Sequence, residues 1–199
     1  FLKFLNKMKI YFVASPRLVV KDPSLYKRIH HYLAKSNVML SDKLLRWTDK
    51  KVLEKIYDED SKEGVNAYKE AIDQVKKADV VMMEISGHST TMGYLISKSL
   101  DLCKPVVVFY KKGTKILFLK GINSPKLKLM EYDKQNIEDL LDRAIEEAKK
   151  EIDVRFNFFV SPKILAYLDW VAQKKMIPRS VFLRNLIEKE IKKEKEFKG

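Results

Sequence analysis

Short apolar runs alternate with amphipathic segments along the first 150 residues of the chain. The runs are too short for helices, and their uniformly apolar composition predicts strands that are buried on both faces of a sheet. The expected strands are residues 9–15, 37–41, 79–85, 105–110 and 126–132. The segments between them repeat apolar residues at helical spacing, and the expected helices are 22–36, one or two within 42–78, 91–102 and 136–151. This alternation predicts an α/β domain over residues 8–150, with a parallel sheet in a Rossmann-like three-layer arrangement.

The last fifty residues follow a different pattern, which begins with strict alternation over 153–162. One face of this expected strand carries Phe156, Phe158 and Val160, and the other carries Arg155, Asn157 and Phe159. Two expected helices follow, one over 162–176 and one that starts with Ser180 as its cap. One strand and two short helices bury too little apolar surface to fold alone, so we expect two copies to intertwine as a homodimer or a larger assembly.

The charge of the chain favours a polyanionic partner. Its formal net charge is +13 at pH 7, which indicates either nucleic acid as a partner or a surface rich in Lys and Glu of the thermophilic type. The single Cys103 allows no internal disulfide, and the neighbouring His30 and His31 on an expected helix suggest no metal site, so we expect no cofactor. No apolar run reaches the roughly 20 residues that span a bilayer, and the opening "FLKFLNK" does not fit a secretory signal. We therefore expect a soluble cytoplasmic protein.

The segment "RFNFFVSPKILAYLDWVAQKKMIPRSVFLRNLIEKEI" resembles the ribbon-helix-helix family of DNA-binding proteins over its whole length. The resemblance implies that residues 153–199 form a β-α-α module whose paired strands lie in the major groove of double-stranded DNA. By position, the expected DNA contacts are Arg155, Asn157 and Phe159 on the strand, and Arg179 and Ser180 at a phosphate beside the second helix. Arginine and asparagine suit guanine and adenine, respectively, whereas Phe159 either meets a thymine methyl or packs against the first domain. Two other interpretations are a plain dimerisation module and an edge strand of the large sheet with two packing helices.

The first domain is similar to the nucleoside 2-deoxyribosyltransferase family, in particular to the deoxynucleoside 5'-monophosphate N-glycosidases. The motifs that carry this resemblance are "KIYFVASPR", "KADVVMMEISGHSTTMGYLISKSLDLCKPVVVFY" and "KLKLMEY", in that order. In the family, a Glu after a Gly-Tyr pair attacks the anomeric carbon, and this chain has Leu95 at that position and Ala71 near the position of the helper Asp. An alkyl side chain cannot act as the nucleophile, so the resemblance implies a catalytically degenerate domain with no catalytic residue. Neighbouring acids are Glu70, Asp73 and Glu84, and Asp73 should point elsewhere on its helix.

The same resemblance implies a phosphate site that is better preserved than the catalytic one. The expected nucleotide-binding or phosphate-binding residues are Ser15, Arg17, Ser89, Gly93 and Tyr94. Leu18, Val19 and Thr91 replace glycines of the family and narrow the space for a ligand. The alternative is that Ser15 and Ser89 only cap helices and form turns, and His88 in the same loop reads as a polar loop residue rather than a base.

These patterns together predict a dimeric DNA-binding transcriptional regulator. Its first domain serves either as a scaffold or as a sensor of a nucleotide or nucleoside monophosphate. One alternative is an active N-glycosidase or deoxyribosyltransferase that uses a displaced acid, and another is a structural scaffold that binds no DNA.

Overall fold

The computed structural model describes residues 7–46, 62–87, 89–133, 135–152, 158–194 and 196. The chain divides into two compact units, Phe1–Asp153 and Val154–Gly199, and each is considered by itself.

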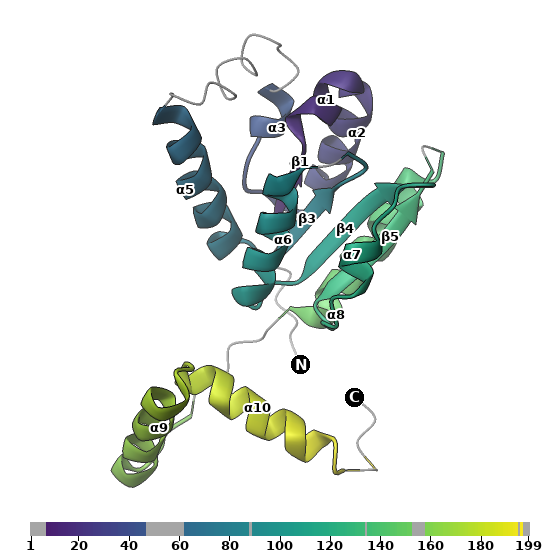
Figure 1. Cartoon of the computed structure of the whole chain (residues 1–199). Helices are drawn as coiled ribbons and strands as arrows, with labels where there is room; N and C mark the ends of the chain where they lie inside the picture. The colour runs from purple at the N-terminus through teal and green to yellow at the C-terminus, as the bar shows by residue number, and fades with distance from the viewer. Residues whose placement is uncertain are drawn as a thin grey trace. The chain divides into compact units, whose positions relative to one another are not determined.

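The first unit is built on a five-stranded sheet in which every neighbouring pair of strands is parallel (Figure 1). The strands are β1 (Lys9–Ala14), β2 (Val38–Met39), β3 (Val80–Glu84), β4 (Val106–Lys111) and β5 (Leu127–Tyr132). Their order across the sheet is β2-β1-β3-β4-β5. The register places Ala14 of β1 beside Glu84 of β3, and Glu84 beside Phe109 of β4. The α/β class and the parallel sheet expected from the sequence are therefore confirmed.

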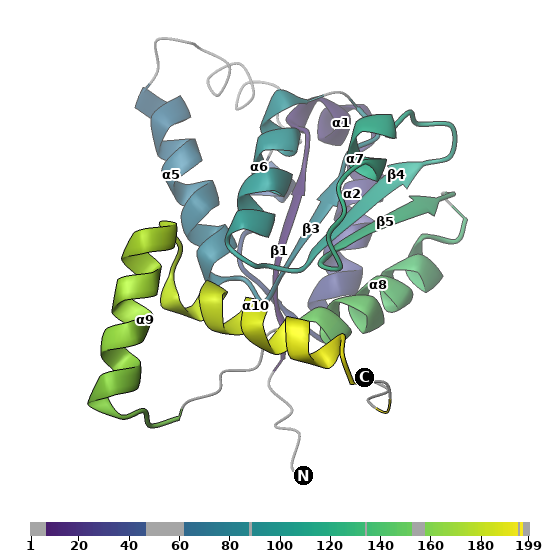
Figure 2. The same ribbon diagram turned by 60° about the horizontal axis from the view of Figure 1, so that its bottom comes forward.

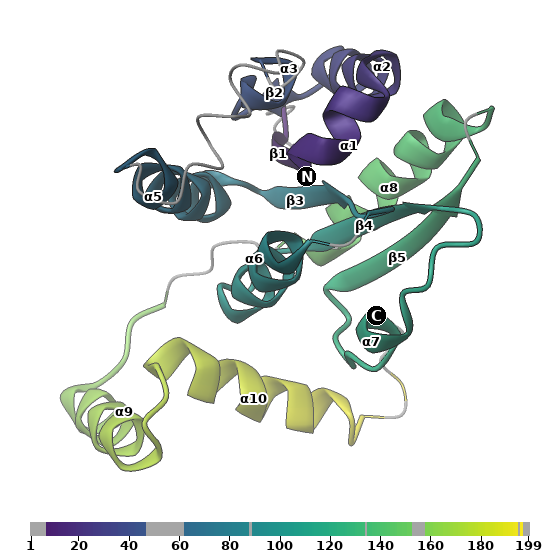
Figure 3. The ribbon, with the colours of Figure 1, turned by 45° about the horizontal axis from the view of Figure 1, so that its top comes forward.

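Helices cover both faces of this sheet, which gives three layers (Figure 2 and Figure 3). One face packs against α1 (Pro16–Lys21), α2 (Pro23–Ala34) and α8 (Ile137–Glu151), and the other against α5 (Lys62–Lys77) and α6 (Thr90–Asp101). Along the central strands, alternate side chains enter the two cores: Phe12 and Met82 join one, whereas Val13 and Met83 join the other. Burial on both faces explains why these strands read as unbroken apolar runs.

Three short elements depart from the expected pattern. α1 and α7 (Leu117–Lys120) were not expected, because helices of six and four residues are too short to show a helical period. The expected strand 37–41 shrinks to the two residues of β2 at the edge of the sheet. Within 42–78, the structure has α3 (Lys43–Arg46) and α5, and the expectations for 47–61 lie outside the described residues.

The second unit contains two helices, α9 (Pro162–Lys175) and α10 (Arg179–Ile191). Ser161 caps α9 by accepting a hydrogen bond from the Ile164 amide at 3.4 Å. The expectation that Ser180 caps the second helix is wrong: the extended Pro178 occupies the cap position, and Ser180 lies one residue inside α10. The carbonyl of Pro178 already accepts from the amides of Val181 and Phe182, so the helix begins before Ser180.

The expected strand 153–162 falls largely outside the described residues. Positions 153–157, with Arg155, Phe156 and Asn157, are not described, and residues 158–161 form no strand in this single chain. The expected ribbon pairs two copies of the chain, so the ribbon-helix-helix module stays a prediction.

Candidate functional site

The crevice between β1 and β3 is the natural ligand position in this fold. The chain leaves β1 for the β2 side of the sheet and leaves β3 for the β4 side, so the strand order reverses between these two strands. In open α/β sheets, ligands bind at such a reversal, outside the carboxyl ends of the strands. Ala14 and Glu84 are paired at that end. The candidate site is therefore built from the residues that follow β1, β3 and β4.

Glu84, the last residue of β3, is fully buried and accepts hydrogen bonds on both carboxylate oxygens. Its Oε2 accepts from the Tyr26 hydroxyl at 2.5 Å. Its Oε1 accepts from the Tyr132 hydroxyl at 3.0 Å, from the Ser86 amide at 3.1 Å and from the Ser86 hydroxyl. These donors stabilise a carboxylate without solvent, because hydrogen bonds to the charged form offset the cost of burying it.

The two tyrosines of this cluster stay protonated over the whole neutral range. Burial is the main cause that raises the pKa of Tyr26 and of Tyr132, and the negative charge of Glu84 raises both further. Each hydroxyl therefore remains a donor to the carboxylate. Glu84 is held in a closed network and has no oxygen directed to solvent.

Leu95 belongs to the hydrophobic core and not to a cleft. It lies in the second turn of α6, is 3% exposed, and packs in the core with Tyr11, Met83 and Ile96. Ala71 of α5 is half-buried against the same core. The two positions that the family resemblance assigns to catalysis thus hold alkyl groups that stabilise the fold.

The other acids named from the sequence are engaged elsewhere. Asp73 is exposed on α5 and accepts a hydrogen bond from Lys77 at 2.6 Å, which confirms that it points away from position 71. Glu70 forms an ion pair with Lys43 of α3.

None of the five expected nucleotide-binding residues lines the cavity described below. Ser15 is buried and begins α1 without a side-chain capping bond, and Arg17 is exposed on α1. Ser89 caps α6 by accepting from the Met92 amide at 3.4 Å, as the alternative interpretation proposed. Gly93 is exposed on α6, and the Tyr94 hydroxyl lies 3.1 Å from that of Tyr68 on α5. His88 lies outside the described residues.

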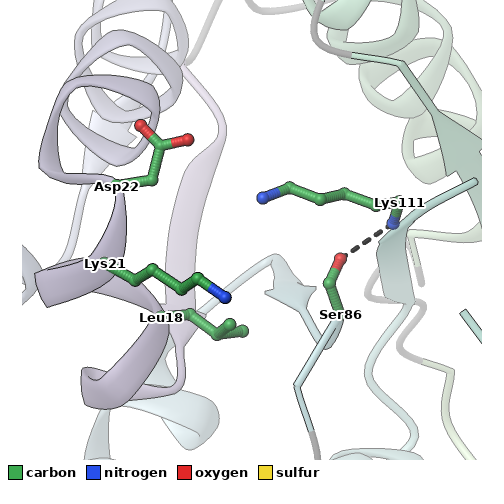
Figure 4. Close-up of a pocket in the computed structure, with 5 residues that line it drawn as sticks. All are labelled: Leu18, Lys21, Asp22, Ser86 and Lys111. Atoms are coloured by element: carbon green, nitrogen blue, oxygen red, sulfur yellow. Dashed lines mark hydrogen bonds between the residues drawn. The ribbon is translucent and has the colours of Figure 1, made fainter.

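A cavity of about 290 Å³ lies at this edge of the sheet and has a different lining. Its lining residues are Leu18, Lys21, Asp22, Ser86 and Lys111 (Figure 4). Leu18 also closes the space over the next turn, because a methyl group on Gly87 would lie 3.0 Å from a Leu18 methyl. The sequence analysis missed Lys21 and Lys111, although each ends an element at the carboxyl edge and that position is the signal that could have found them.

The expected DNA contacts in the second unit are described only in part. Phe159 is fully exposed, and Arg179 forms an ion pair with Asp169 of α9. Arg155 and Asn157 are outside the described residues. The DNA-binding residues stay predictions.

Comparisons with known proteins do not place the chain in a family. No family model matches it, and a search of curated proteins finds no match either. The two family resemblances therefore stay predictions from residue patterns. In the part of the chain that the structure describes, no helix combines the length and apolar character needed to cross a bilayer, and no cluster of His, Cys, Asp and Glu is arranged to hold a metal ion.

Proposed function

We propose that this protein is a dimeric DNA-binding regulator whose α/β unit is not catalytic and acts as a scaffold or as a ligand sensor. The observation that carries the proposal is the surface of the second unit. Among its described residues, the buried core is Leu168, Val171 and Phe182, with Ile177 and Leu183 packed against it, whereas large apolar side chains are exposed on both α9 and α10. The exposed residues include Ile164, Leu165, Tyr167, Trp170, Leu186, Ile187 and Ile191. Such a surface needs a partner, and a second copy supplies a complementary one.

Charge supports nucleic acid as the target of the dimer. Residues 154–199 contain eleven Lys and Arg against five Asp and Glu, and pairing two copies doubles this excess. Lysine and arginine neutralise phosphates, and this sequence-independent term dominates affinity for DNA. Arg155 and Asn157 then add preference for particular bases.

The first unit supports the non-catalytic half of the proposal. Leu95 is a core residue, and Glu84 is fully buried with both oxygens accepting hydrogen bonds. A nucleophile must be able to contact its target atom, and both of these side chains are buried.

The test is a titration of the full chain against duplex DNA at increasing salt, with duplexes chosen by sequencing the fragments that the protein retains. We expect affinity to fall steeply with salt, with a logarithmic slope of about −0.9 for each phosphate contact. Arg155→Ala should reduce the difference in affinity between retained and random duplexes. Arg143→Ala, which removes an exposed arginine from α8, should leave that difference unchanged. Undetectable or salt-insensitive binding would rule out DNA as the partner and favour a structural scaffold.

One observation favours the enzymatic alternative as a second candidate function. Asp22 lines the cavity and is the displaced acid that an N-glycosidase would need, although its Oδ1 already caps α2 by accepting from Ser24 Oγ at 3.0 Å and from the Leu25 amide at 3.4 Å. The measurement is release of free base from deoxynucleosides and their 5'-monophosphates. Asp22→Asn keeps the helix cap but removes the acid. Turnover in the wild type that is lost in this variant would favour the hydrolase over the regulator as the function of the protein.

A further inference from the structure

We propose that the cavity at the carboxyl edge of the sheet binds a small tetrahedral oxyanion, either free phosphate or the phosphate group of a small metabolite, between Lys21 and Lys111. These residues differ from the phosphate-binding set expected from the sequence. A regulatory effect of the anion on DNA binding rests on the proposed function, whereas binding itself does not.

Two lysine side chains converge on this cavity from opposite sides. Lys21 ends α1 and Lys111 ends β4, and both ammonium groups extend toward the middle of the cavity (Figure 4). Among the described residues, neither ammonium group has a carboxylate within ion-pair distance. Asp22 also lines the cavity, but the two cations still repel each other across it, and a bound oxyanion would turn this repulsion into two attractions.

The wall that carries Lys111 is held rigidly. The Lys111 amide donates to Ser86 Oγ at 2.8 Å, and the Ser86 hydroxyl in turn donates to Glu84. Glu84 is fixed by the hydroxyls of Tyr26 and Tyr132. The buried network therefore positions the backbone from which one anion ligand extends, and a preorganised site loses less entropy on binding.

The residues that line the cavity favour a small tetrahedral anion as the ligand. Lysine ammonium groups are compact point charges, and two of them on separate elements can approach different oxygens of a tetrahedral group. Planar carboxylates are better matched by the fork of an arginine, which this lining does not contain. Asp22 can accept a hydrogen bond from a hydroxyl of the ligand or of a monoprotonated phosphate. The volume of about 290 Å³ is near the lower end of ligand sites, so the ligand is small.

The experiment is calorimetric titration of the full chain with inorganic phosphate, and separately with glycerol 3-phosphate, in a low-salt buffer without phosphate. We expect saturable binding at one site per chain for at least one of the two ions. Tighter binding of glycerol 3-phosphate identifies a phosphorylated metabolite as the natural source, and equal or weaker binding identifies free phosphate. Lys21→Gln and Lys111→Gln should each raise the Kd about tenfold or more, as expected for the loss of a charge-assisted hydrogen bond.

Two further variants make the result specific to this cavity. Asp22→Asn should lower the Kd several-fold, because it removes a negative charge beside the anion and keeps the cap of α2. Lys27→Gln changes an exposed lysine on α2 and should leave the Kd unchanged. Thermal unfolding without phosphate verifies that each variant is folded. If Lys111→Gln does not fold, Lys21→Gln still tests the proposal, because Lys21 is exposed.

The absence of saturable binding at millimolar concentrations of either ion would overturn the proposal. It would also be overturned if Lys27→Gln weakened the affinity for the ion as much as Lys21→Gln does. Weaker phosphate binding in Asp22→Asn would also overturn it. Phosphate binding without DNA binding would instead refute the proposed function and leave this site in place.

Discussion

Two single residues, Leu95 and Glu84, carry the proposal that the first unit is not catalytic. Leu95 is buried in the core at the position where the family that the sequence resembles has a catalytic carboxylate, and the carboxylate of Glu84 is fully buried. Neither side chain is accessible to a ligand, because both are buried. Glu84 therefore contributes to stability and to the shape of the nearby cavity.

The stability of the unit should depend on the hydrogen bonds that the two carboxylate oxygens of Glu84 accept. Glu84→Gln keeps the shape but replaces an acceptor oxygen with an amide group that donates, which conflicts with hydroxyl donors such as those of Tyr26 and Ser86. We expect the free energy of unfolding to fall by about 1–3 kcal/mol, measured by urea denaturation followed by circular dichroism. Glu131→Gln, an exposed change on β5, should leave it within about 0.5 kcal/mol. Equal stability of Glu84→Gln and the wild type would contradict the closed network.

Among the elements, α6 differs most from its expected role. The resemblance assigned ligand contacts to its first turns, whereas the structure places Ser89 at its cap, Leu95 in the core and Tyr94 against α5. Gly93 is exposed on this helix, and a methyl group added there would meet no atom within 4 Å. The glycine has no packing reason to be there.

We therefore expect Gly93→Ala to stabilise the protein. Alanine loses less backbone entropy than glycine inside a helix, and the gain should be about 0.5–1 kcal/mol in chemical denaturation. Gly113→Ala is the contrasting variant, because Gly113 has a φ of 85° in the turn after β4 and alanine should destabilise that turn. If the wild type binds a nucleotide and the stable Gly93→Ala variant does not, this result would support the ligand site that the resemblance implies.

At the scale of the whole molecule, the exposed apolar surface of the second unit supports the proposed association of two chains. Three buried apolar side chains cannot offset the entropy of ordering two helices, so we expect the second unit to be stable only in an assembly. Leu186, Ile187 and Ile191 form an exposed apolar stripe on α10, and a second copy of the chain is the expected partner of that stripe.

A charge in this stripe should separate the copies. Ile187→Glu places a carboxylate in the expected interface, and we expect the dimer dissociation constant to rise about a hundredfold in sedimentation equilibrium. Asn185→Glu adds the same charge about 200° around the helix at an exposed polar position and should have little effect. A wild-type monomer at micromolar concentration, or an unchanged dimer in Ile187→Glu, would remove the basis for the regulator.

The comparison between sequence and structure separates local from non-local information. The apolar pattern predicts β3 and α8. A continuous apolar run indicates a strand buried on both faces, and apolar residues at helical spacing indicate an amphipathic helix, so both signals lie in neighbouring residues. The convergence of Lys21 and Lys111 on one cavity cannot be predicted from neighbouring residues, since the two lysines come from distant segments that only the tertiary fold brings together. The sequence places Glu84 within an expected buried strand, but its partners Tyr26 and Tyr132 come from distant segments.

The backbone of Met176 fixes the bend between α9 and α10. This residue has a left-handed φ of 54°, rare for a side chain of its size, and its amide and that of Ile177 both bond back into the last turn of α9. These bonds lie within one chain, so the bend between α9 and α10 does not depend on a second copy. Each protomer would meet the other with its helices already angled, which lowers the entropic barrier to association and favours one mutual orientation over many.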